Sequence, residues 1–113
     1  MREQIKDSAR LVHILHAIQN VFNFMDGKNE NDLKTNAMLF YAVVKNIEII
    51  GEASYKLTET FKITHPDTPC RQIIKMRHIL THGYYQVSPD EIYGVYINDL
   101  PTLKAQITSY LQQ

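Results

Sequence analysis

Apolar residues recur at steps of three and four along most of the chain, which is the spacing of one face of an α-helix. The first such run begins at about Glu3 and ends at Met25, where Asp26-Gly27 is a typical stop signal. Its apolar positions are Ile5, Ala9, Val12, Leu15, Ile18, Phe22 and Met25. We therefore expect a first helix over residues 3–25 with one face in the core.

A second, longer run extends from about Asp32 to Thr64, with Asn31 or Asp32 as the candidate N-cap. Its apolar ridge is Ala37, Phe40, Val44, Ile47, Ile50, Leu57 and Phe61. Gly51 lies inside this helix, where glycine costs about 1 kcal/mol relative to alanine. Its presence there indicates a bend or a close crossing with another helix.

The same predicted helix carries charged residues at helical steps, including two glutamates one turn apart. The charged positions are Lys45, Glu48, Glu52, Lys56 and Glu59. Glu48 and Glu52 are candidates for a carboxylate pair that assists a neighbouring base. The alternative is that they are solvent-facing partners of salt bridges.

His65-Pro66 ends the second helix, because the residue before a proline avoids the helical conformation. Thr68 is then the candidate N-cap of a third helix, with Pro69 at its first position. The apolar residues of this helix are Ile73, Ile74, Met76, Ile79 and Leu80. Gly83, a residue suited to the left-handed conformation after a helix, predicts an end at or near His82.

Ser88-Pro89-Asp90-Glu91 is the clearest helix start, with the pattern of a capping box and proline at the first position. Asp99-Leu100-Pro101 predicts a restart or kink. The last apolar side is Leu103, Ile107 and Leu111. With no strand alternation and no repeat, the sequence predicts one all-α domain over residues 1–113, an antiparallel bundle of four or five helices.

The composition of the chain argues against several classes of function. The 12 basic and 12 acidic residues cancel, which argues against a surface that binds nucleic acid non-specifically. The single cysteine excludes an internal disulfide and is compatible with a reducing cytoplasm. We see neither a secretory signal after Met1 nor the about 18 consecutive apolar residues of a membrane span, so we expect a cytoplasmic protein.

The charge is uneven in one segment. Residues 62–82 contain one acid, Asp67, and the basic side chains Lys62, His65, Arg71, Lys75, Arg77, His78 and His82. Such a patch attracts phosphate, although a solvated helix face has the same composition. Elsewhere, His13 and His16 are three apart, but no carboxylate on the same helix completes a ligand set, so we expect no metal site.

Arg77, His78, His82 and Tyr84 fall within eight positions at the end of the third helix. A helix that stops near His82 lets the long Arg77 side chain reach beside the imidazole. Such a cluster is able to bind an anion and move a proton. The alternative is structural: Arg77 pairs with Glu48 or Glu52, and His82 caps the helix end.

The spacing Arg77-x4-His82-x-Tyr84 resembles the Arg-x4-His-x-Tyr signature of the HepT-like toxins in the HEPN superfamily. The resemblance extends to the segment 46–53, to His65-Pro66 and to Asp99-Leu100-Pro101, and covers residues 43–107. It implies an all-helical, metal-independent RNase without a cofactor. It also implies a homodimer in which the two motifs meet in one cleft.

The resemblance further implies a partner, an MntA-type minimal nucleotidyltransferase antitoxin that transfers AMP to the motif tyrosine, here Tyr84. One departure from relatives is His78, where asparagine is frequent. Our hypothesis is that His82 is the acid and base and Arg77 the phosphate clamp, with His78, Glu48 and Glu52 as candidate assisting residues. The alternative is a non-catalytic helical subunit that binds a nucleotidyltransferase or a nucleotide.

Overall fold

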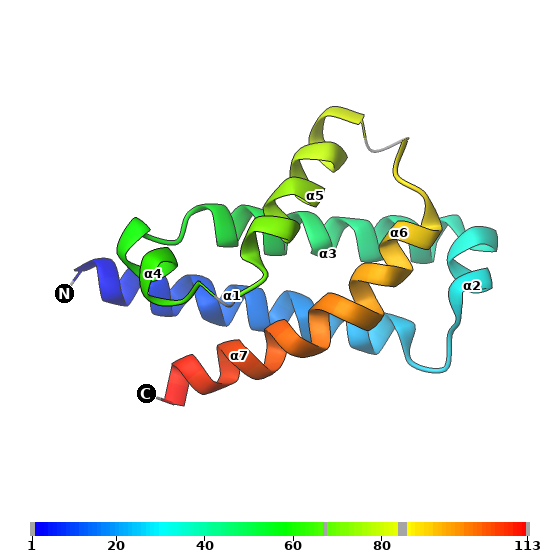
Figure 1. The fold of residues 1–113 in the computed structure, drawn as a ribbon. Helices are drawn as coiled ribbons and strands as arrows, with labels where there is room; N and C mark the ends of the chain where they lie inside the picture. Colours follow the sequence, from blue (N-terminus) through cyan, green and yellow to red (C-terminus); the bar gives the residue numbers. More distant parts are fainter. Residues whose placement is uncertain (1, 67, 84–85, 113) are drawn as a thin grey trace.

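The computed structural model describes residues 2–66, 68–83 and 86–112, and these residues form helices and connecting turns without any strand. The all-α prediction is therefore confirmed (Figure 1). The elements are α1 (Arg2–Met25), α2 (Glu30–Thr35), α3 (Ala37–Tyr55), α4 (Glu59–Thr64), α5 (Cys70–Gly83), α6 (Pro89–Gly94), the π-helical turn η2 (Val95–Asp99) and α7 (Leu100–Gln112).

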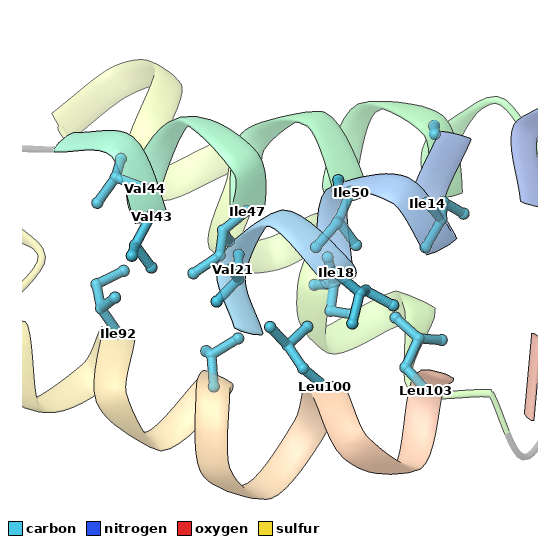
Figure 2. Packing of buried hydrophobic residues seen from close by; sticks show 14 of the residues in the cluster. Ile14, Ile18, Val21, Val43, Val44, Ile47, Ile50, Ile92, Leu100 and Leu103 are labelled. Atoms are coloured by element: carbon cyan, nitrogen blue, oxygen red, sulfur yellow. The ribbon is translucent and has the colours of Figure 1, made fainter. Parts of the chain in front are cut away.

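The long helix α3 lies between α1 and α5, and α7 packs on the other side of α1 (Figure 1). The core fills the space between α1, α3 and α7 with aliphatic side chains that are inaccessible to solvent (Figure 2). Its fully buried members include Ile14, Ile18, Ile47, Ile50, Leu100 and Leu103. In contrast, α5 packs mainly on α3, so most of its circumference stays outside this core.

The single helix predicted over residues 32–64 is wrong, because Asn36 interrupts it. The Asn36 backbone N–H donates to the Asp32 carbonyl and closes α2, while its side chain accepts from Leu39 N–H and opens α3. The predicted N-cap is also wrong: the Asn29 side chain caps α2 by accepting from the Asp32 N–H, and the Asp32 carboxylate accepts from the Asn29 N–H. Side-chain competition for backbone groups thus divides a continuous apolar pattern.

A second interruption separates α3 from α4. The Asp7 carboxylate accepts hydrogen bonds from Thr58 N–H (3.0 Å) and the Thr58 hydroxyl (2.7 Å). That hydroxyl in turn accepts from Phe61 N–H and caps α4. Asp7 is 51 residues away in the sequence, so this break depends on a tertiary contact.

Gly51 marks a helix crossing, as predicted. A Cβ atom at this position would lie 2.8 Å from the Arg77 Cγ and 3.1 Å from the Ile73 carbonyl oxygen, and it would overlap the Arg77 Cβ. The absence of a side chain lets α5 approach the backbone of α3. This contact sets the position of α5, which carries the candidate site.

The start of α6 is confirmed, because the Ser88 hydroxyl accepts from Glu91 N–H at 3.2 Å. The predicted kink at Asp99-Leu100-Pro101 takes the form of η2, in which the Leu100 N–H donates to the Val95 carbonyl. Pro101 has no N–H and its ring crowds the preceding turn, which favours the wider π geometry just before it.

Candidate active site and nucleic-acid interface

Helix α5 has two faces of different character. Ile73 and Leu80 are buried toward the body of the protein, and Arg77 lies between them in the helical sequence. The opposite face carries Arg71, Lys75, His78 and His82, all exposed, at steps of four, three and four. These four basic residues line an open groove of about 540 Å³, the histidine groove, together with Ile74, Ile79, Gly83 and Gln86.

The two imidazoles of the groove are in contact. The ring centroids of His78 and His82 are 4.7 Å apart, with an interplanar angle of 69°. A step of four residues places both rings on one face of α5, where they meet edge to face. Both rings are exposed, so a proton on either one can exchange with solvent or with a ligand in the groove.

Arg77 is held on the other side of α5. Its guanidinium forms an ion pair with the Glu52 carboxylate of α3, which also pairs with Lys56 at 3.5 Å. The Arg77 side chain retains 27% exposure, so it is still partly accessible to solvent. Glu48 lies half-exposed one turn earlier, and among the ion pairs of the described residues the partner of Arg77 is Glu52.

The expected approach of Arg77 to His82 within one chain is therefore not what the structure shows. A step of five residues turns about 140° around a helix, and the helix continues through His82 to Gly83. The left-handed conformation expected at Gly83 is wrong, because Gly27 alone has a positive φ among the described residues. The pairing of Arg77 with Glu52 matches the structural alternative, whereas His82 faces the groove.

Tyr84, the residue predicted to be modified, lies outside the described residues. The described residues on either side of it in the sequence, Gly83 and Gln86, form part of the groove lining. A Cβ at position 83 would lie 3.3 Å from the Gln86 Oε1, so the Gln86 side chain lies close to Gly83.

A second hollow, which the sequence did not reveal, adjoins the first. It has a volume of about 560 Å³ between α4 and α5 and shares Arg71 and Ile74 with the histidine groove. Tyr55 and His65 are two of its aromatic members. In the sequence, Tyr55 and His65 lie on either side of residues 56–64, and the apolar spacing did not predict that this segment contains a separate helix.

Other candidate chemistry is limited. Within the described ranges, no three His, Cys, Asp or Glu side chains are grouped closely enough to hold a metal ion. His13 and His16 are both exposed on α1. None of the helices in the described part of the chain combines the length and apolar character needed to cross a membrane.

The fold and site define a small helical protein with a basic, histidine-bearing groove, which is the chemistry of phosphodiester binding. The family comparison agrees, since the model described as "Ribonuclease HepT-like" matches residues 14–110. The chain therefore belongs to the HepT-like ribonuclease family. No solved structure gives a significant match.

Several proteins that are similar to this chain are also described as ribonucleases. The chain is 30% identical to a "Putative RNase" of Methanocaldococcus jannaschii over 88% of this chain and 91% of the relative. It is also 30% identical to a "Probable ribonuclease HepT" of Thermococcus cleftensis over 93% and 90%. A further M. jannaschii protein, "Gamma-glutamylcyclotransferase and putative RNase", is 33% identical over the whole of this chain but only half of its own length.

Proposed function

We propose that this protein is a metal-independent endoribonuclease, that it acts as a homodimer, and that it is the toxin of a type VII-like toxin–antitoxin pair. Membership of a ribonuclease family supports the reaction class. The observation that carries the proposal is the pair of exposed, touching imidazoles, His78 and His82, in a groove with Arg71 and Lys75. His82 is assigned as the acid and base, and Arg77 as the phosphate clamp.

The groove suits RNA cleavage because RNA supplies its own nucleophile, the 2′-hydroxyl, and imidazoles supply the base and the acid. A neutral imidazole removes its proton, the oxygen attacks the adjacent phosphorus, and the bond to the 5′-oxygen breaks. An imidazolium donates a proton to that departing oxygen, which leaves a cyclic phosphate and a free 5′-hydroxyl. Histidine fits both roles because its unperturbed pKa of about 6.5 is close to working pH.

The homodimer is proposed because one chain separates the two key groups. The Arg77 guanidinium lies beside α3 on Glu52, whereas His82 faces the groove. A twofold partner that packs along α5 would add its own Arg77 and His82 to one cleft. A guanidinium that stays protonated throughout the reaction would then stabilise the negative charge that develops on the phosphoryl oxygens.

The decisive assay measures cleavage of single-stranded RNA in EDTA by the wild type and by the His82→Ala and Arg77→Ala variants. Loss of a positioned acid or base typically costs about 10²- to 10⁴-fold in rate, and we expect a decrease of that order for His82→Ala. His16→Ala, which removes an exposed histidine from α1, is the matched control and should cleave like the wild type. Equal rates in all four proteins would remove the assignment.

A mixing experiment tests the composite cleft. Equal amounts of the His82→Ala and Arg77→Ala proteins, mixed and allowed to exchange subunits, form heterodimers that contain one intact Arg77 and one intact His82 on different chains. We expect part of the activity to return in the mixture. Dimers that form, exchange and remain inactive would instead place the required arginine and histidine on the same chain.

Silencing is proposed to occur by AMPylation of Tyr84. A minimal nucleotidyltransferase of the MntA type would transfer AMP from ATP to the phenolic oxygen and release pyrophosphate. The added phosphate would place negative charge next to a groove that attracts phosphate. Incubation with ATP, magnesium and such a transferase, followed by peptide mass spectrometry, tests this: AMP on another residue, or none, contradicts it.

The Arg77–Glu52 ion pair favours one alternative, a helical subunit that binds a nucleotidyltransferase or a nucleotide without cleaving RNA. In that case Arg77 serves to fasten α5 to α3. The assay in EDTA separates the two functions, because a binding subunit leaves RNA intact at every protein concentration.

A further inference from the structure

The hollow between α4 and α5, which we call the aromatic hollow, has a composition of its own. The members used below are Tyr55, Phe61, Lys62, His65, Arg71 and Ile74. It is less open to solvent than a flat surface patch, because α4 and the start of α5 form its two sides. Three of these members offer aromatic rings, and two offer permanent positive charge.

The rings of the aromatic hollow are fixed by packing. His65 stacks on Phe61, with ring centroids 4.1 Å apart and an interplanar angle of 17°. The rings of His65 and Tyr110 of α7 pack edge to face with centroids 4.3 Å apart, and the Tyr110 hydroxyl is hydrogen-bonded to the Thr68 hydroxyl. The His65 Nδ1 is within hydrogen-bonding distance, 2.9 Å, of the Phe61 carbonyl. Such a platform binds a flat ligand with little loss of side-chain freedom.

Tyr55 and Lys62 line the hollow together. Tyr55 ends α3 with 59% of its surface exposed, which is a large aromatic area to leave in water. The Lys62 ammonium donates to the Tyr55 carbonyl at 3.0 Å and lies 5.5 Å from the centroid of the Tyr55 ring. It also pairs with Glu59 at 3.8 Å. An aromatic ring and an ammonium group are thus held together in the lining of the hollow.

Arg71 and Ile74 line both the aromatic hollow and the histidine groove, so the two hollows are adjacent parts of one surface. Along α5 the distance from Arg71 to His82 is roughly 16 Å, at about 1.5 Å per residue. Arg71 and Lys75 lie along this path, both exposed. The order along the surface is therefore aromatic rings, then cations, then imidazoles.

We propose that the aromatic hollow binds a nucleobase of a single-stranded RNA whose scissile phosphate lies at His82, with the intervening phosphates on Arg71 and Lys75. This rests on the proposed function and names its substrate class. Alternating base-stacking rings and cations are how proteins bind single-stranded nucleic acid without reading each base. A base inside a duplex cannot enter the hollow, so paired RNA is excluded by geometry.

The test measures RNA affinity by fluorescence anisotropy with the non-cleaving His82→Ala protein and a labelled single-stranded oligonucleotide. Each base is removed in turn by an abasic substitution. We expect one position, a few nucleotides from the cleavage point, at which loss of the base weakens binding roughly tenfold. A fully paired RNA of the same sequence should compete poorly.

The second arm repeats the scan with Tyr55→Ala added. Tyr55 is exposed, so its removal leaves the core intact. We expect the sensitive position to lose its effect, because ring and base no longer meet, while the other positions keep theirs. Tyr41→Ala is the matched control, since Tyr41 is 55% exposed on the same helix, and it should reproduce the parent scan.

A flat scan, or a sensitive position unchanged by Tyr55→Ala, overturns the proposal and leaves the hollow to another occupant such as a protein partner. The separate cleavage assay in EDTA keeps this result distinct from failure of the nuclease assignment. Cleavage with a flat scan refutes the aromatic hollow alone. Coupling between Tyr55 and one base, together with a wild-type protein that does not cleave RNA in the separate assay, refutes the nuclease and retains the RNA site.

Discussion

Replacement of Gly51 by alanine tests whether the crossing of α3 and α5 positions the site. The new Cβ would overlap the Arg77 Cβ, lie 2.8 Å from its Cγ and approach the Ile73 carbonyl oxygen to 3.1 Å. These atoms belong to the backbone or the base of a side chain, so a rotamer change cannot relieve the overlap. The α5 helix must move away from α3.

The magnitude follows from two opposing effects. Overpacking of a well-packed contact costs up to about 3 kcal/mol. Alanine is about 1 kcal/mol more favourable than glycine inside a helix. We therefore expect Gly51→Ala to lower the free energy of unfolding by about 2 kcal/mol, a large share of the 5–15 kcal/mol that is typical of folded proteins. At roughly 4 °C per kcal/mol, the Tm should fall by about 8 °C.

Urea denaturation followed by circular dichroism measures this, with the midpoint shifted and the slope unchanged. All variants are compared at one protein concentration, because dimerisation would make the apparent stability concentration-dependent. RNA cleavage measured in parallel should also fall, since α5 carries the proposed catalytic residues Arg77 and His82 and its movement displaces both.

Gly94→Ala is the matched control. A Cβ at this helical glycine would meet only the Asn98 Nδ2, at 3.9 Å, which is an ordinary contact. The same chemical change should therefore stabilise the protein, by about 0.5–1 kcal/mol. If Gly51→Ala were as stable as the wild type, the close crossing of α3 and α5 would be refuted, whatever the control shows.

Three further predictions follow from the contacts. Asp7→Ala removes both acceptors of Thr58 and should cost about 2 kcal/mol in urea denaturation, whereas a cost below 0.5 kcal/mol would contradict the tie between α1 and α4. Ser88→Ala removes the cap of α6 and should cost about 1 kcal/mol, with Ser88→Thr retaining most of the stability. Burial raises the pKa of Asp99 above its ordinary 3.8. Its carboxyl is therefore harder to ionise in the folded protein than in the unfolded chain, so the free energy of unfolding decreases as the pH rises through the raised pKa. Asp99→Asn should therefore be more stable than the wild type at pH 7 and lose that advantage below about pH 3.9, and equal differences at both pH values would refute this.

The sequence located some helix boundaries that depend on neighbouring residues and missed others, since Asn29 and Asn36 cap α2 and α3 through local hydrogen bonds that the apolar pattern did not indicate. Met25 ends α1 before Asp26-Gly27, and Gly27 takes a φ of 73° there. Ser88 starts α6. These signals are hydrogen bonds or backbone conformations within a few residues, so they are present in the chain before any tertiary contact forms.

The sequence was less informative where a distant residue decides the local structure. The break before α4 requires Asp7, and apolar spacing across Leu57 and Phe61 gives no sign of it. As a result, α4 was merged into a longer helix, and the aromatic hollow beside it was not expected. Spacing reports that a side chain is buried but not which element buries it.

By itself the sequence determined the helical class, the Gly51 crossing and a cluster of arginine and histidines on α5, together with the motif that places the chain in its family. Only the tertiary structure decided how that cluster is divided. It put Arg77 against Glu52 on α3 and left His78 and His82 together on the open face. The reason is that α5 packs mainly on α3, and rotation of the helix about its axis is fixed by the fit of Ile73 and Arg77 over Gly51.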